Sequence, residues 1–102
     1  MAQFDVFINP IAIPAYPFVV AMQSELTING SEQLVAPIAS VDYRRLPVRR
    51  IIPVVAVQGN DHLVLVPRLA VMRSRDLIHK VDSIAAARAE LLAAIDYLFF
   101  GV

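Results

Sequence analysis

The chain has 102 residues, is 58% hydrophobic, and carries nine basic and nine acidic side chains, so that its formal net charge is zero. This length suits one domain, 1–102, and a core too small to bury all of that apolar surface, so we expect part of it to form a homodimer interface. The absence of cysteine excludes disulfides, thiol chemistry and cysteine metal sites.

The apolar runs are too short to form a transmembrane helix. The longest fall far short of the ~18 residues needed to span a bilayer. The first seven residues, MAQFDVF, lack the basic region and long apolar region of a signal peptide. The sequence therefore predicts a cytoplasmic protein without a membrane segment.

The first two thirds of the chain are predicted to form strands. Residues 3–8, 18–22 and 34–38 have strand character; a proline-rich loop follows the first, and Pro37 interrupts the third. Residues 51–57 and 62–66 form the clearest hairpin, because the intervening 58–61 (QGND) tolerates the positive φ of a tight reversal. Both runs are apolar at nearly every position, which predicts burial on both faces, as in a small closed sheet or at a dimer contact.

The period changes after residue 72, and a helix is predicted from about residue 84. Asp82 or Ser83 can cap its start, and Gly101 is placed to end it. With Ile95 at the centre of the buried stripe, the core face at about 100° per residue consists of the following side chains: Ile84, Leu91, Leu92, Leu98 and Phe99.

The opposite face of this helix is unusually smooth. It carries Ala86, Ala89, Ala93, Asp96, Tyr97 and Phe100. Asp96 opposes the helix dipole, and local rules are often broken at functional sites. We therefore expect Phe99 to be structural and Phe100 to be available to a partner, with the alternative that Phe100 folds back or packs on a dimer mate.

The charges are sorted along the chain. Residues 1–43 contain no Lys or Arg, whereas residues 44–75 contain seven arginines against one acid, Asp61. The arginines are Arg44, Arg45, Arg49, Arg50, Arg68, Arg73 and Arg75. Such a band is either a solvated face or a surface for phosphates or an acidic peptide.

No catalytic or metal-binding motif is recognisable, and no cofactor is expected. The sequence has no glycine-rich phosphate loop, no metal-ligand spacing and no nucleophile elbow. His62 and His79 are isolated, and a lone His beside an apolar strand is more often an ordinary hydrogen-bonded residue. One enzymatic option survives, an RNase in which Arg44 and Arg45 stabilise a phosphoryl transition state.

Five segments resemble the CcdB family of toxins from plasmid and chromosomal toxin–antitoxin modules. They are QFDVF at 3–7, MQSEL at 22–26, LVAPIAS at 34–40, IPVV at 52–55 and AIDYLFFGV at 94–102. The resemblance spans nearly the whole chain. The order and spacing of these segments, together with the terminal FFGV, make the resemblance specific.

The resemblance implies a mainly β (α+β) fold and a non-enzymatic mechanism. CcdB-like toxins are homodimers with an SH3-barrel-like antiparallel sheet and a C-terminal α-helix, a plan shared with MazF-type RNase toxins. They bind the A subunit of DNA gyrase and trap the gyrase–DNA cleavage complex, which serves plasmid maintenance. A CcdA-type antitoxin neutralises them with an acidic, disordered tail, and operator DNA is reached only through that antitoxin.

Carried over position by position, the resemblance implies a set of gyrase-binding residues. These are Leu26, Thr27, Asp96, Phe99, Phe100, Gly101 and Val102. Phe100 stands where Trp is usual, Asp96 where Asn is usual, and Leu26 with Thr27 where two isoleucines are usual. The acidic antitoxin tail is expected at Arg44, Arg45, Arg49 and Arg50.

Two alternatives to the gyrase poison stay open from the sequence. The first is a MazF-like endoribonuclease toxin on the same fold, because a fold does not fix the chemistry. The second is a structural or antitoxin-binding dimer without toxicity.

Overall fold

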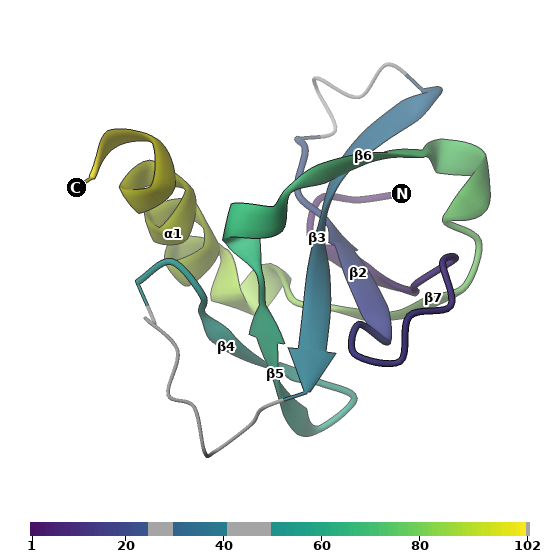
Figure 1. The fold of residues 1–102 in the computed structure, drawn as a ribbon, viewed down its shortest axis with the longest axis horizontal. Helices are drawn as coiled ribbons and strands as arrows, with labels where there is room; N and C mark the ends of the chain where they lie inside the picture. The colour runs from purple at the N-terminus through teal and green to yellow at the C-terminus, as the bar shows by residue number, and fades with distance from the viewer. Residues whose placement is uncertain (25–29, 41–49, 102) are drawn as a thin grey trace.

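The computed structural model describes residues 1–24, 30–40 and 50–101, which form a curled antiparallel sheet and a C-terminal helix (Figure 1). The strands are β1 (Asp5–Ile8), β2 (Phe18–Ala21), β3 (Glu32–Ser40), β4 (Val54–Val57), β5 (Asn60–Val64), β6 (Ala70–Arg73) and β7 (Lys80–Ser83). Three 3₁₀ turns, η1 (Val66–Arg68), η2 (Ser74–Asp76) and η3 (Ala85–Ala87), precede α1 (Arg88–Phe100). The mainly β, barrel-like sheet with a C-terminal helix confirms the predicted fold class.

The sheet curls far enough for a side chain to bridge its two end strands. The strand order is β4-β5-β3-β2-β1-β7, and β6 pairs with β3 off this path. Asp82 of β7 accepts the backbone N–H of Gln58, in the β4–β5 turn, at 2.7 Å, and the N–H of Ser83 at 2.7 Å. These hydrogen bonds, from Gln58 first, lower the pKa of the Asp82 carboxyl below its ordinary value of 3.8.

The β4–β5 hairpin is confirmed and turns within two residues. Val57 lies opposite Asn60, so Gln58 and Gly59 form the turn. Their φ angles are 50° and 81°, the two positive values that a type I′ turn requires. Gly59 adopts this conformation without steric cost, whereas Gln58 does not.

Pro37, which was expected to interrupt a short strand at 34–38, lies inside a continuous nine-residue strand. β3 pairs with β6 through residues 32–35 and with β5 through residues 38–40, so Pro37 falls where the partner changes. Its carbonyl accepts the N–H of Leu65 at 2.9 Å, on that same edge. The donor that proline lacks is therefore missing at a break in the ladder, where it costs least.

Two apolar layers cover opposite faces of the central strands. The layer beneath α1 includes Val6, Val20, Ala36, Ile38, Val55, Val57, Val64, Val66, Ile84, Leu91 and Ala94. The second layer consists of Phe7, Val19, Ala21, Val35 and Leu77, with Met72 packed against it. Neighbours along β1, β2 and β3 alternate between the two layers, as the pleat requires.

Burial on both faces therefore occurs in different strands from those predicted. In β4, Val55 and Val57 are buried while Ala56 is exposed, and in β5 Leu63 is only half-buried. The prediction that a closed sheet buries 51–57 and 62–66 on both faces was therefore wrong, and burial of their outer face at a dimer contact stays a prediction. Their outer face has no covering layer among the described residues, whereas the segment from β6 to Leu77 covers the central strands.

The helix starts later than predicted, because a strand and a 3₁₀ turn occupy its expected first residues. Asp82 and Ser83 belong to β7, and Ala87 precedes α1 without a side-chain cap. Ser83 instead accepts the N–H of Ala85 at 3.3 Å, in the 3₁₀ turn. Arg88 fixes the first turn of α1 by donating to the Gln3 side chain at 2.9 Å.

Candidate functional site: the C-terminal end of the helix

The buried stripe of α1 is centred between Leu91 and Ala94 rather than on Ile95. Leu91 and Ala94 are fully buried, and Leu98 and Ile95 are partly buried against the same core. At about 100° per residue, Phe99 lies roughly 100° from the centre of this stripe and Phe100 about 150°. The side chain of Phe99 is 64% exposed, so its predicted structural role was wrong.

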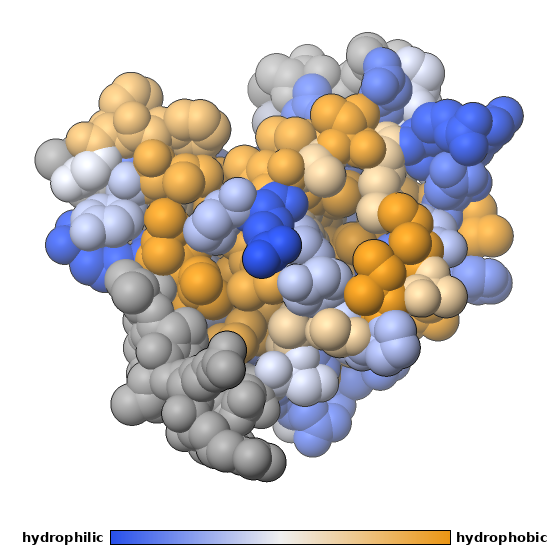
Figure 2. All heavy atoms as spheres, in the orientation of Figure 1, coloured by the Kyte–Doolittle hydropathy of each residue, from blue (hydrophilic) through white to orange (hydrophobic). Residues whose placement is uncertain are grey.

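The helix therefore ends in two neighbouring exposed aromatic rings. Phe100 is 74% exposed, and Asp96, one turn earlier, is also exposed. Figure 2 shows apolar atoms gathered over the C-terminal turns of α1. The predicted outer face is confirmed in part, since Ala89 and Ala93 of α1 and Ala86 of η3 are exposed as well, whereas Tyr97 is half-buried.

Gly101 ends the helix as predicted. It is left-handed, with φ 73°, and its N–H donates to the Tyr97 carbonyl at 2.9 Å. The last turn is thus closed by its own backbone. Phe99 and Phe100 remain part of a regular helix up to the final residue before the cap.

The side of the last turn is covered by an arginine from the residues before β4. The guanidinium carbon of Arg50 lies 4.4 Å from the centroid of the Tyr97 ring, within the ~6 Å of a cation–π contact. Arg50 is exposed and Tyr97 is half-buried. Tyr97, which was expected on the smooth face, is therefore occupied by a cation of the same chain.

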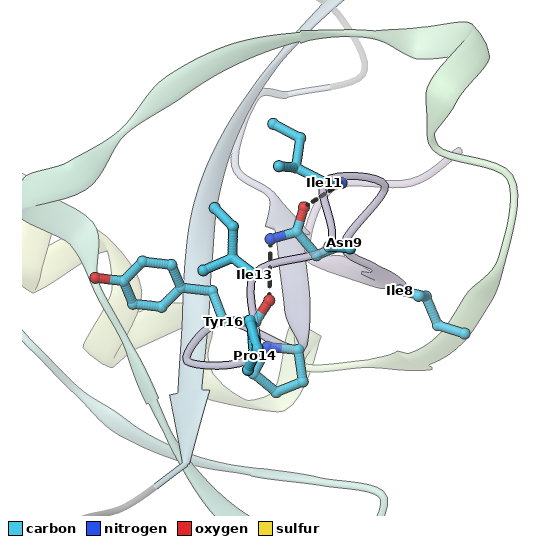
Figure 3. A pocket seen from close by; sticks show the side chains of 8 residues that line it. Ile8, Asn9, Ile11, Ile13, Pro14 and Tyr16 are labelled. Atoms are coloured by element: carbon cyan, nitrogen blue, oxygen red, sulfur yellow. Dashed lines mark hydrogen bonds between the residues drawn. The ribbon is translucent and has the colours of Figure 1, made fainter.

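A second exposed apolar surface lies at the loop between β1 and β2. Ile8, Ile11 and Ile13 are 48%, 56% and 40% exposed and line a hollow of about 320 Å³ (Figure 3). The Asn9 side chain orders this loop by accepting the Ile11 N–H at 3.0 Å and donating to the Tyr16 carbonyl at 2.9 Å. Ile11 also lines a neighbouring hollow with Val71 of β6, so the loop and β6 share one apolar surface.

The histidines do not form a site. His62 is buried, and its Nδ1 lies 2.7 Å from the Asn60 carbonyl, to which it donates, while His79 is exposed. Within the described ranges, no three His, Cys, Asp or Glu side chains come together as a metal site. No helix in this part of the chain is long and apolar enough to cross a membrane.

Several predicted site residues fall outside the described ranges. These are Leu26, Thr27, Val102, Arg44, Arg45 and Arg49. Of the predicted gyrase-binding residues, the structure brings Asp96, Phe99, Phe100 and Gly101 together at the end of α1. Of the predicted antitoxin-binding residues, it describes Arg50 alone.

Comparison with known proteins assigns this chain to a family. A family model described as CcdB protein matches residues 3–101. The chain belongs to the CcdB family. It is accordingly a toxin of a toxin–antitoxin system. A direct search of curated proteins gave no match.

Sequence reasoning missed two features of this CcdB-family chain. The contact between Arg50 and Tyr97 joins residues 47 positions apart, and no local pattern signals it. The exposed isoleucines around the β1–β2 loop did have a signal in the sequence. Three isoleucines occur in the six residues 8–13, where the proline-rich segment begins. Apolar residues in a loop that the core cannot reach indicate an interaction surface.

Proposed function

We propose that this chain poisons DNA gyrase by binding its A subunit through the C-terminal end of α1, so that gyrase is trapped with its DNA cleaved. Family membership supports this mechanism, and one structural observation carries its placement: Phe99 and Phe100 are 64% and 74% exposed in the last turn of a regular helix. Exposed neighbouring rings are unusual at a surface unless a partner covers them.

The chemistry of the helix end suits an arginine on gyrase. The face of Phe100 can stack on a guanidinium group, a contact worth about 0.5–1 kcal/mol at an exposed site. Asp96, one turn away, offers a carboxylate to the same partner. Phe99, Gly101 and Val102 complete the proposed surface on the chain, with Leu26 and Thr27 from the segment after β2.

The remaining partners follow the same proposal. The toxin acts in the cytoplasm as a homodimer. The high apolar content and the exposed side chains of Ile8, Ile11 and Val71 support the dimer. A CcdA-type antitoxin neutralises it by laying an acidic tail on Arg44, Arg45, Arg49 and Arg50. The toxin then meets operator DNA only through the antitoxin.

The test separates the gyrase poison from the RNase. Purified protein is incubated with gyrase and supercoiled plasmid and, in a separate reaction, with RNA alone. We expect linear, gyrase-linked DNA after denaturation in the first reaction and intact RNA in the second. RNA fragments in the absence of gyrase would instead show that the protein is an endoribonuclease.

A further inference from the structure

The last turn of α1 is held to the rest of the chain from one side. On its core side Leu98 is partly buried, whereas Asp96 and Phe100 on the outer side are exposed. Tyr97 lies between these two sides, and the Arg50 guanidinium covers its ring at 4.4 Å. Among the described residues, this cation–π contact therefore holds the side of the last turn that carries Tyr97.

Arg50 reaches Tyr97 from a point anchored to the sheet. Three residues later, Pro53 is buried, and its carbonyl accepts the N–H of Val64 in β5 at 3.0 Å. The chain that carries Arg50 is thus attached to the sheet three residues after it. The contact between Arg50 and Tyr97 therefore links the end of α1 to the segment that joins β4.

The charge of Arg50 also suits its place at the end of a helix. The last carbonyls of a helix carry partial negative charge, which a nearby cation stabilises. Asp96 in the same turn has the opposite effect, and α1 itself has no basic residue in its last turn. Arg50, over the Tyr97 ring, brings a positive charge from outside the helix to the side of this turn.

We propose that Arg50 is a positioning residue for the partner-binding end of α1. By stacking on Tyr97 it fixes the last turn, and with it the orientation of Phe100. It also occupies one face of Tyr97, so that an incoming cation meets Phe99 and Phe100 instead. The consequence for gyrase binding rests on the proposed function, whereas the restraint on the helix end does not.

The variants are chosen to separate a role through Tyr97 from a direct contact with the partner. Arg50→Gln and Tyr97→Leu each remove the cation–π contact, and the double variant removes both partners. Arg50→Lys and Tyr97→Phe keep a cation over a ring. Arg75→Gln is the matched control, because Arg75 is an exposed arginine in η2, away from the proposed surface.

Titration of the purified gyrase A subunit measures the effect on the partner. We expect Arg50→Gln and Tyr97→Leu each to weaken binding about two- to fivefold, the range of an exposed cation–π contact. The double variant should bind no worse than either single one, and Arg50→Lys should recover most of the loss. Loss of affinity on Arg50→Gln within the Tyr97→Leu background would instead assign Arg50 to direct contact and overturn the proposal.

Amide hydrogen exchange on the free protein tests the restraint without gyrase. In Arg50→Gln, the amides of Phe100 and Gly101 should exchange faster, while those of Leu91 and Ala94 stay as in the wild type. Unchanged exchange at Phe100 and Gly101 would refute the positioning role. If exchange changes as expected but the wild-type protein fails to bind gyrase, the proposed target is wrong and the positioning role stands.

Discussion

Replacing the rings at the end of α1 should separate toxicity from folding. A fully buried aromatic side chain removes about 150–250 Å² from water, worth about 25 cal/mol per Å². Phe99 and Phe100 are 64% and 74% exposed, so only a quarter to a third of each is covered. Truncating either ring to alanine should therefore lower the free energy of unfolding by only about 1–2 kcal/mol. Leu91→Ala, in the fully buried stripe, should lower it by about 2–5 kcal/mol.

Thermal melts at one protein concentration and growth on induction in a gyrase-sensitive host measure the two effects. Phe99→Ala and Phe100→Ala should melt near the wild type and lose growth inhibition, whereas Leu91→Ala should lose it by unfolding. Ile78→Ala is the matched control, because Ile78 is 69% exposed and lies outside the proposed surface. If Phe100→Ala melts as early as Leu91→Ala, the ring belongs to a packed core and the placement of the site is refuted.

Three further predictions concern stability and assembly. Asp82→Asn should destabilise the protein at neutral pH. Because the pKa of Asp82 is lowered in the folded protein, its charged carboxylate stabilises the fold above about pH 4, and this stability is lost as the pH falls through the pKa of the folded state. The melting temperatures of the two proteins should therefore converge in acid. A difference in melting temperature that stays constant with pH would contradict this. Gln58→Asn should raise the midpoint of denaturant unfolding, because Asn tolerates positive φ in a type I′ turn better than Gln, and an unchanged or lower midpoint would count against that turn. Sedimentation at micromolar concentration should show a dimer, and a folded monomer would contradict the proposed assembly.

The fold was predictable where local sequence decides it. The β4–β5 hairpin follows from Gln58-Gly59 between two apolar runs, and the end of α1 follows from Gly101. β7 was not predictable in the same way. Its four residues, KVDS, are largely polar and become a strand only by pairing with β1, more than seventy positions earlier.

The end of α1 was predictable in position, but the side chains that it exposes were not. Periodicity gives the spacing of a buried stripe, and its phase depends on where the helix meets the core. Here η3 precedes a helix that begins at Arg88 and meets the core through Leu91 and Ala94, and Phe99 is left exposed. The contact of Arg50 with Tyr97 depends on tertiary structure alone, so no pattern in the sequence indicates it.

Cleavage trapping by the folded Phe100→Ala protein tests the central claim most directly. Gyrase, supercoiled plasmid and increasing amounts of wild-type or Phe100→Ala protein are incubated together, and linear DNA is measured after denaturation and protease treatment. We expect the wild type to accumulate cleaved DNA and Phe100→Ala to leave the plasmid intact at the same concentrations. Equal cleavage by both proteins would show that the exposed end of α1 does not hold gyrase.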